Sequence, residues 1–277
     1  MGKQKPPTYS EIFQELLSVV YQPISINELI DKFLEVRVPQ TKNPRSSIRS
    51  KIREENGRLL IFTDDDHILP IDIAYRMVHF RIIITKKMLF KRMIPLDEFE
   101  LYFSHKLLLD NLLLDKLKFL DEDGSAIDAT IFTTTKRKNS HFGSYDETYH
   151  SLGLGAWFKQ HKAKPNDHII VTIHNSQTGT LRLSLESAIH FNQELVTAQN
   201  QQLADIMYDL LECESSEMLM IQTAIATAYA RLPEKTTCSA NSVGQIITQD
   251  DRMVYDGWHI RYADSRPGLL ESMMSDE

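Results

Sequence analysis

The chain has 277 residues, of which 42% are hydrophobic and 25% charged, the balance of a globular protein with more than one domain. Its net charge of −7 argues against a protein that binds nucleic acid with its whole surface. No window approaches the roughly 20 apolar residues of a membrane helix, and the first ten residues lack the apolar core of a secretory signal, so we expect a cytoplasmic protein with no membrane partner.

Residues 1–75 are expected to form a domain of three helices followed by a β-hairpin. Apolar residues recur at helical spacing in the first two helices, and the third has Asn43 as its cap and Pro44 in its first turn. Three consecutive aspartates, at residues 64–66, favour a turn between two strands. Helices are predicted over residues 8–20, 26–36 and 43–58, and strands over residues 59–63 and 68–71.

The third helix combines basic and hydroxyl side chains. From Lys42 to Arg58, six basic residues stand against two acidic ones. Ile48 and Ile52 are four residues apart and give a narrow apolar seam. We therefore expect this helix to dock by one edge and to present its other edge to an anionic partner.

The order of three helices and a hairpin resembles the winged helix-turn-helix family, and within it the HARE-type domains of bacterial transcription and restriction proteins. The resemblance covers about residues 8–72 and rests on TYSEIFQELL, ISINELIDKF, the basic third helix and LLIF…DDDHILPI. It implies that the third helix enters the major groove of DNA. The acidic hairpin tip departs from the family pattern and is expected to point away from DNA or toward a protein. The candidates for DNA contact are Arg45, Ser46, Arg49, Ser50 and Arg53.

Residues 76–186 change to a pattern of strands and are expected to form a second domain. The β-branched segment at residues 79–96 predicts strands with a basic turn at Lys86 and Lys87. The other expected elements are a short helix over residues 97–107, a segment at residues 107–120 that fits helix or strand, a strand from residue 126, a helix with Trp157 and Phe158, and strands over residues 168–173 and 180–185.

The segments FLDEDGSAIDATIF and WFKQHKAKPNDHIIVTI resemble the B3-type pseudobarrel, known from plant transcription factors and from the effector domains of some bacterial restriction enzymes. Asn166 stands where that family usually has glycine, and asparagine tolerates the positive φ of such a turn. The resemblance implies an open β-barrel with two arms that grip the major groove, where Lys and Arg bind phosphates and Arg or Asn can read base edges. Carried over by position, the arms contain Lys86, Lys87, Lys91 and Arg92, and Thr134, Lys136, Arg137, Lys138, Asn139 and Ser140.

Residues 187–234 are expected to form a helical hairpin, which can pack on the barrel or on a second copy of the chain. Residues 235–277 are predicted to be a mostly disordered tail because their composition is polar. One segment of this tail is expected to dock on a domain or to bind a partner through its aromatic residues, which are Tyr255, Trp258 and Tyr262.

The sequence has no signature of an enzyme. It contains no Walker loop, no GxGxxG that opens a helix, no GxSxG and no HExxH, and no Cys or His spacing fits a metal site, so we expect no catalysis and no cofactor. Residues 121–123 fit a turn, and His141, His150 and His161 fit ordinary surface or core positions. The two cysteines are expected to be free thiols.

We therefore predict an α+β chain with an N-terminal winged helix, a central B3-like open β-barrel and a C-terminal helical hairpin. Its predicted partner is double-stranded DNA, which it would recognise by sequence as a transcriptional regulator or as the recognition component of a restriction or defence system. The alternative is an adaptor that binds proteins through the winged helix and the C-terminal helices without binding DNA. A homodimer through the C-terminal helices is compatible with both.

Overall fold

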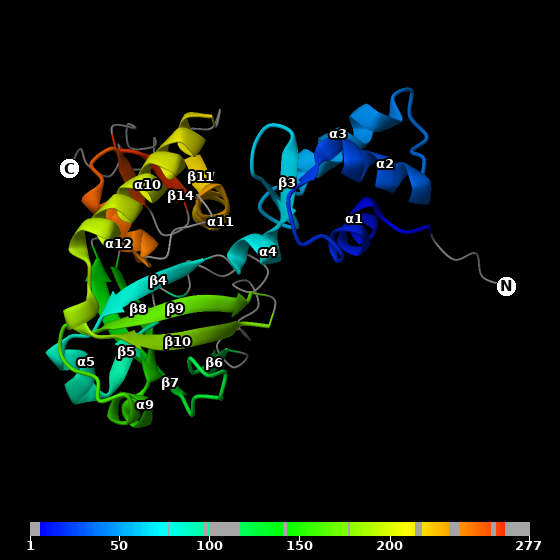
Figure 1. Ribbon diagram of the computed structural model, residues 1–277. Helices are drawn as coiled ribbons and strands as arrows, with labels where there is room; N and C mark the ends of the chain where they lie inside the picture. Colours follow the sequence, from blue (N-terminus) through cyan, green and yellow to red (C-terminus); the bar gives the residue numbers. More distant parts are fainter. Residues whose placement is uncertain are drawn as a thin grey trace.

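The computed structural model describes residues 6–76, 78–96, 99, 117–140, 143–176, 178–213, 218–232, 239–255 and 259–263. These residues form a mixed α+β molecule with four small sheets. Figure 1 shows the N-terminal helices at one end of the molecule, and the central strands with the C-terminal helices at the other. Each helix in these ranges is too short or too polar to span a lipid bilayer.

The N-terminal unit, residues 8–70, contains three helices and a three-stranded sheet in the order β1-β3-β2. Side chains of Thr8, Ser25 and Asn43 cap its three helices by accepting backbone hydrogen bonds. The predicted helices and hairpin are present, with the first and third helices shorter than expected and a two-residue strand that was not predicted. The elements are α1 (Tyr9–Leu17), β1 (Ile24–Ser25), α2 (Ile26–Val36), α3 (Pro44–Glu54), β2 (Leu60–Phe62) and β3 (His67–Pro70).

The hairpin of β2 and β3 separates two hydrophobic cores. Leu60 and Ile68 are buried in the core of the N-terminal unit, whereas Ile61 and Leu69 are buried in the core of the rest of the molecule. Successive side chains of a strand point to opposite faces, so one hairpin can serve both cores. The acidic turn at residues 64–66 is the part of the hairpin that reaches the solvent.

The central part contains two sheets. One has five strands in the order β12-β4-β9-β10-β6, and the other has three strands in the order β5-β8-β7. The described strands do not close into a barrel. The elements are α4 (Ile71–Tyr75), β4 (His79–Ile83), α5 (Lys86–Lys91), β5 (Met93–Pro95), β6 (Lys118–Leu120), β7 (Thr130–Ser140), β8 (Gly143–Gly153), α9 (Gly155–Gln160), β9 (His168–Asn175) and β10 (Thr180–Glu186).

The sequence prediction for the central part was wrong at one point, because Lys86 and Lys87 begin a helix instead of forming a turn between strands. The side chain of Thr85 caps α5 by accepting a hydrogen bond from the backbone N–H of Met88, and this cap favours a helix over a turn. The predicted helix with Trp157 and the predicted strands on either side of residues 176–179 are confirmed. Most of the elements predicted over residues 97–120 lie outside the described residues.

The turn before β9 has the conformation that the sequence suggested. Asn166 has a φ of 72°, in the left-handed region. Its backbone N–H donates to the carbonyl of Ile84 at 2.8 Å, and the Asp167 side chain accepts from the backbone N–H groups of Lys164 and Ala188. The turn thereby joins the end of β4 to the start of β9.

The C-terminal unit, residues 188–262, is more than a helical hairpin with a tail. Val243, Ile246 and Ile247 are buried in the main core, so residues that were predicted to be disordered form ordered elements instead. Ile260 and Tyr262 also pack in this core, and they belong to the segment that was expected to dock on a domain or to bind a partner. Their apolar side chains are sparse, but they fall at positions that meet the core. The elements are the 3₁₀ helix η1 (Ala188–His190), α10 (Gln193–Glu212), β11 (Met218–Met220), α11 (Ile221–Arg231), β12 (Ala240–Asn241), α12 (Val243–Gln249), β13 (Met253–Tyr255) and β14 (His259–Tyr262).

The N-terminal and C-terminal units share one order of elements. Each has a helix, a short strand that leads directly into a second helix, a third helix and a final hairpin. In each three-stranded sheet, the last strand lies in the middle: β1-β3-β2 in one unit and β11-β14-β13 in the other. The C-terminal unit differs in one respect, since β12 precedes its third helix and joins the five-stranded sheet beside β4.

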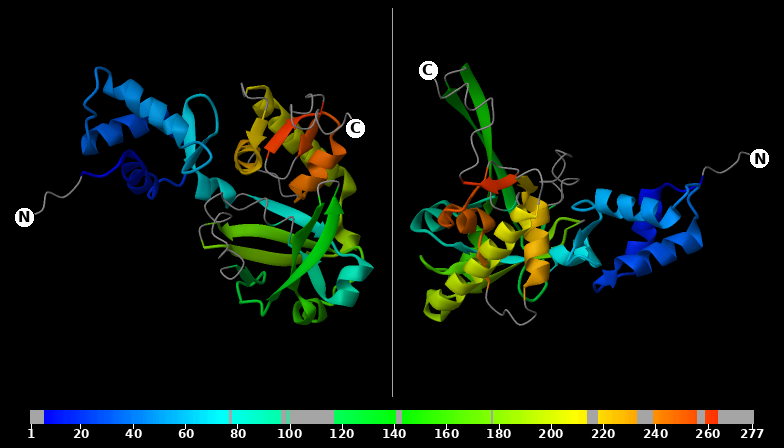
Figure 2. Two further views of the ribbon diagram at one scale, coloured as in Figure 1. Left: turned by 180° about the vertical axis from the view of Figure 1, so that it is seen from behind. Right: turned by 90° about the horizontal axis from the view of Figure 1, so that it is seen from above.

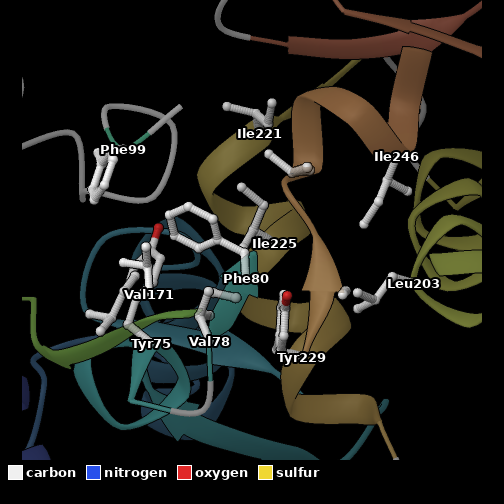
Figure 3. Close-up of a cluster of buried hydrophobic side chains, with 14 of the residues drawn as sticks. Tyr75, Val78, Phe80, Phe99, Val171, Leu203, Ile221, Ile225, Tyr229 and Ile246 are labelled. Carbon is white, nitrogen blue, oxygen red and sulfur yellow. The ribbon is translucent and has the colours of Figure 1, made fainter. Parts of the chain in front are cut away.

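The main core lies between the five-stranded sheet and the C-terminal helices (Figure 3). Val78 and Phe80 face Ile225 and Tyr229 of α11, and Ile246 of α12 lies beside them. The hydroxyl of Tyr229 donates to the backbone carbonyl of His79, and that of Tyr75 donates to the carbonyl of Gln222. The sheet and the C-terminal unit therefore share one continuous core.

Candidate nucleic-acid interface

A groove of about 840 Å³ separates α5 from the antiparallel strands β7 and β8. We call these two strands the ribbon, and Figure 2 shows that it extends beyond the body of the molecule. One wall of the groove comes from α5, the other from the ribbon, and the floor from β5. The two predicted arms, which are more than 40 residues apart in the sequence, therefore meet at one site.

The wall formed by α5 ends in a constrained arginine. Arg92 has a φ of 57°, and its backbone N–H donates to the carbonyl of Leu89 at 3.2 Å. Its side chain lies against Gly155, where an added Cβ would come within 3.0 Å of Arg92 Cδ. The backbone N–H of Leu154 donates to the carbonyl of Arg92 at 2.9 Å. These contacts fix the position of Arg92 at the edge of the groove.

The wall formed by the ribbon carries aromatic rings. The ring of Phe132 lies so close to Gly153 that a Cβ there would be 2.7 Å from its Cε2 atom. Phe132 is 47% exposed and faces the groove. Further along, the ammonium groups of Lys136 and Lys138 lie 5.2 and 5.7 Å from the ring centre of Tyr149. The ribbon therefore presents an apolar base, and the outer half of β7 carries three basic residues, with Glu147 and Asp146 of β8 opposite Lys136 and Arg137.

The groove is positive on a negative chain. Four cationic side chains line it against one carboxylate, Asp128, whereas the whole chain has a net charge of −7. His150 also lines the groove, with its Nδ1 atom 3.2 Å from the hydroxyl of Thr133. The cations that line the groove are Lys87, Lys91, Arg92 and Lys136.

The structure divides the predicted arm residues into three groups. Lys87, Lys91, Arg92, Thr134 and Lys136 line the groove. Lys86, Arg137 and Lys138 lie outside the groove lining and are exposed, and strand alternation places Arg137 on the face of the ribbon opposite to Lys136 and Lys138. Asn139 and Ser140 belong to β7, but their side chains are outside the described set.

Three of the four basic residues of α3 have partners within the N-terminal unit. Arg45 pairs with Asp31, and Lys51 pairs with Glu54. The guanidinium of Arg49 donates to the side-chain oxygen of Asn27 at 2.9 Å. The other three predicted contact residues, Ser46, Ser50 and Arg53, are exposed.

The basic helix α3 is remote from the two basic segments of the groove, α5 and the ribbon. Figure 1 and both views of Figure 2 place α3 and α5 on opposite sides of the molecule. The acidic turn beside α3 is negative and ordered, because Asp64 accepts hydrogen bonds from the backbone N–H groups of Asp66 and His67. These hydrogen bonds, together with His67, lower the pKa of Asp64 below its usual value.

Sequence reasoning missed the aromatic residues of the groove. Phe132 and Tyr149 lie on the same face of the ribbon as Lys136, which a two-residue alternation along β7 and the pairing of Thr134 with Tyr149 explain. The alternation along β7 was available in the sequence, but the partner strand was not. Without the register, an aromatic residue on β8 could not be assigned to the basic face.

The acidic turn at residues 121–123 has a structural role. Asp121 is buried and accepts hydrogen bonds from Trp157 Nε1 at 3.1 Å and from the ring of His161 at 2.8 Å. Burial alone would raise the pKa of Asp121, but these hydrogen bonds and one from the Glu122 N–H lower it below its usual value. The hydrogen bonds of Asp121 with Trp157 and His161 join α9 to the strand β6, which Asp121 follows. Within the described residues, no three of His, Cys, Asp and Glu come together as metal ligands.

Comparison of the chain with known proteins finds no relative that could inform the function of the groove. No protein-family model, no curated protein and no solved structure matches the chain. The properties of the groove are therefore those of its own lining: cations on both walls, an apolar floor, and aromatic rings on the ribbon.

Proposed function

We propose that the chain binds double-stranded DNA with the groove between α5 and the ribbon. The observation that carries this proposal is the meeting of two basic segments, distant in sequence, on one groove of a chain that is otherwise acidic. Cations on both walls fit a ligand with regularly spaced negative charges, such as the phosphates of a nucleic acid. A single phosphate would need fewer cations, closer together.

The ribbon has the dimensions of a DNA-reading element. The major groove of B-form DNA is about 12 Å wide and admits a two-stranded β-ribbon. At roughly 3.3 Å per residue, the 11 residues of each strand span about 36 Å, so the outer half of the ribbon can enter the groove while its base stays on the protein. Lys136 and Lys138 would then lie near phosphates, and Arg137 would face the other side of the ribbon.

Two further inferences about the fold belong to this proposal. Three helices and a three-stranded sheet support a winged helix for the N-terminal unit, and the left-handed turn at Asn166 before β9 supports a B3-like pseudobarrel for the central part. We infer these folds for the two parts. A role in transcription regulation, or in recognition within a restriction or defence system, follows from those resemblances.

A second function is supported for the N-terminal unit, namely protein binding. Three of the four cations of α3 are engaged by Asp31, Asn27 and Glu54, and the exposed tip of the hairpin is acidic. This surface fits a basic protein partner better than a phosphate backbone. The two functions are compatible, because α3 and the groove lie far apart (Figure 1).

The test is an electrophoretic mobility shift with mixed-sequence duplex DNA at about 50 mM salt, a condition in which phosphate contacts dominate. The wild-type chain should shift the duplex, and replacing Lys87, Lys91 and Lys136 by Ala should weaken the shift strongly. The matched variant with Arg45 and Arg49 replaced by Ala should still bind. If the second variant alone loses binding, α3 is the DNA-binding element. If the wild-type chain never shifts DNA and purifies with a protein partner instead, the adaptor function is correct.

A further inference from the structure

Phe90 is an aromatic side chain without a structural role. It is 89% exposed, the highest value for a large hydrophobic residue in the described part of the chain. Helical residues turn by about 100° each. Phe90 therefore projects from α5 between Lys86 and Lys87, while Met88 and Leu89 pack against the core. The helix is anchored by two apolar residues and presents a third one to the solvent.

The helix segment that carries Phe90 contains only basic and apolar residues. Residues 86–92, KKMLFKR, contain four basic residues and no acidic one. All four basic side chains are exposed, and three of them line the groove. An apolar ring amid cations complements a ligand in which flat apolar groups lie between negative charges. The stacked bases and phosphates of a nucleic acid have this pattern.

We propose that Phe90 is a wedge that inserts between neighbouring base pairs of the bound duplex. The proposal rests on DNA binding by the groove, as proposed above. Apolar side chains that enter a base step unstack it and kink the duplex. Unstacking and unpairing cost least where the pairing is already weak, as at a mismatch. The protein should therefore prefer duplexes that contain a weakly stacked step over uniformly paired ones.

The geometry favours a nucleic acid over an anionic membrane as the partner of Phe90. A flat lipid surface would meet the outer side of α5, where Lys86, Lys87 and Phe90 project. It would not reach Lys136, which faces the helix from the opposite wall of the groove. A nucleic-acid strand can enter the groove and contact both walls while Phe90 reaches the bases.

The experiment measures fluorescence anisotropy with the full chain and two labelled 30-base-pair duplexes, which are identical except for one central T·T mismatch. The wild-type chain should bind the mismatched duplex at least about fivefold more tightly, the lower end of the range for loss of one aromatic–base stack. Phe90→Ala should lose this preference. Phe90→Trp should retain it, and the fluorescence it adds over the wild-type chain should be quenched on DNA. Tyr21→Ala, which removes an aromatic residue that is 66% exposed in the N-terminal unit, should leave the preference intact.

Three results would overturn the proposal. Equal binding of the two duplexes by the wild-type chain would show that no step is unstacked, although DNA binding itself would stand. A preference that survives Phe90→Ala would assign the effect to another residue. A blue shift of Phe90→Trp on vesicles of anionic phospholipid, without quenching on DNA, would assign the ring to a membrane. Absence of binding to both duplexes would instead reject the proposed DNA-binding function, and the wedge with it.

Discussion

At the scale of single residues, one glycine sets the shape of the groove wall. Gly153 lies in the central strand of its sheet and pairs with Met93 on one side and Thr130 on the other. Because it has no side chain, the ring of Phe132 can lie diagonally across its backbone. A Cβ at this position would be 2.7 Å from the Phe132 ring and 3.2 Å from the carbonyl oxygen of Thr130.

We predict that Gly153→Ala reduces the free energy of unfolding by about 1–3 kcal/mol, because the Phe132 ring must move out of its place. In a Phe132→Ala background, the same substitution should cost clearly less, since its closest neighbour is gone. Chemical denaturation of the four proteins in this cycle gives the coupling energy. Strictly additive effects would mean that the ring does not lie over Gly153.

A second residue-scale feature is the buried charge of Arg81, which is 2% exposed. It pairs with Glu186, donates to Nδ1 of His168 at 2.9 Å and to the carbonyl of Ser239, and lies over the ring of Phe191. Burial and the charge of Arg81 lower the pKa of His168 below its ordinary value of 6.5, more than Glu186 raises it. For Glu186, burial alone would raise the pKa, but Arg81 and His168 lower it below the ordinary value.

These shifts predict a loss of stability in acid. Below about pH 6.5, the unfolded chain binds a proton at His168 before the folded protein does, so the free energy of unfolding falls by up to about 1.4 kcal/mol per pH unit per proton. Below about pH 4.5, Glu186 adds a loss of the same sign. Denaturant titrations from pH 8 to pH 5 should show this fall, and His168→Gln should weaken it. If His168→Gln leaves the pH dependence unchanged, the loss of stability does not come from protonation of His168.

The positions of basic residues in the candidate site could be predicted from the sequence. Lys87, Lys91, Arg92 and Lys136 were carried over by position from the two arms that the B3-type resemblance implies, and they do line one groove. The sequence could not separate Lys136 from Arg137, because that choice depends on the face of the ribbon each one occupies. Nor could the sequence show that Arg45 and Arg49 of α3 have partners, because Asn27 and Asp31 belong to the preceding helix.

At the scale of elements, the two outer units are variations of one arrangement with different surfaces. In the N-terminal unit, α3 is basic and largely exposed. In the C-terminal unit, the corresponding helix α12 has no charged residue, and Val243, Ile246 and Ile247 are buried in the main core. The third helix of the first unit is therefore exposed to solvent, whereas the second unit supports the central sheets through β12.

The C-terminal sheet offers a direct test of order in the last part of the chain. Ile260 on β14 is fully buried, whereas Val254 on the neighbouring strand β13 is 36% exposed. We expect Ile260→Ala to cost about 2–5 kcal/mol in the free energy of unfolding, and Val254→Ala less than about 1 kcal/mol. Thermal and chemical denaturation measure both. If both substitutions leave the free energy of unfolding unchanged, the last part of the chain is not packed on the core, and the prediction of a disordered tail would be correct.

Element prediction succeeded where periodicity was long and failed where it was short. The apolar spacing of α2 and the β-branched run of β9 identified those elements almost to the residue. The two-residue strand β1 and the short elements α12, β13 and β14 carry too few apolar residues to show a period. They form because tertiary contacts with the core compensate for weak local preference.

At the scale of the whole molecule, the N-terminal unit is docked on the C-terminal unit through a glycine. Gly57, after α3, has a φ of 77°, and a Cβ there would be 2.3 Å from the hydroxyl oxygen of Thr223 on α11. The strands β2 and β3 bury Ile61 and Leu69 against the main core beside it. This contact fixes the direction in which α3 points.

We predict that Gly57→Ala destabilises the docked arrangement through both a clash and an unfavourable φ. In the double variant with Thr223→Ala, the closest atom becomes a Cβ at 3.5 Å, so only the backbone cost of about 1–2 kcal/mol should remain. Unfolding measurements on the two single variants and the double variant test this. If Thr223→Ala gives no rescue, Gly57 and α11 are not in contact.

The central claim is that phosphates bind in the groove between α5 and the ribbon, and the salt dependence of DNA affinity tests it most directly. The slope of log K against log salt concentration changes by about 0.9 for each phosphate contact on duplex DNA. Replacing Lys87, Lys91 and Lys136 by Ala should therefore make the slope shallower by roughly 2–3, whereas replacing Arg45 and Arg49 should change it by less than about 1. Two results would contradict the claim. In one, the groove substitutions leave the slope unchanged; in the other, the substitutions in α3 remove the salt dependence.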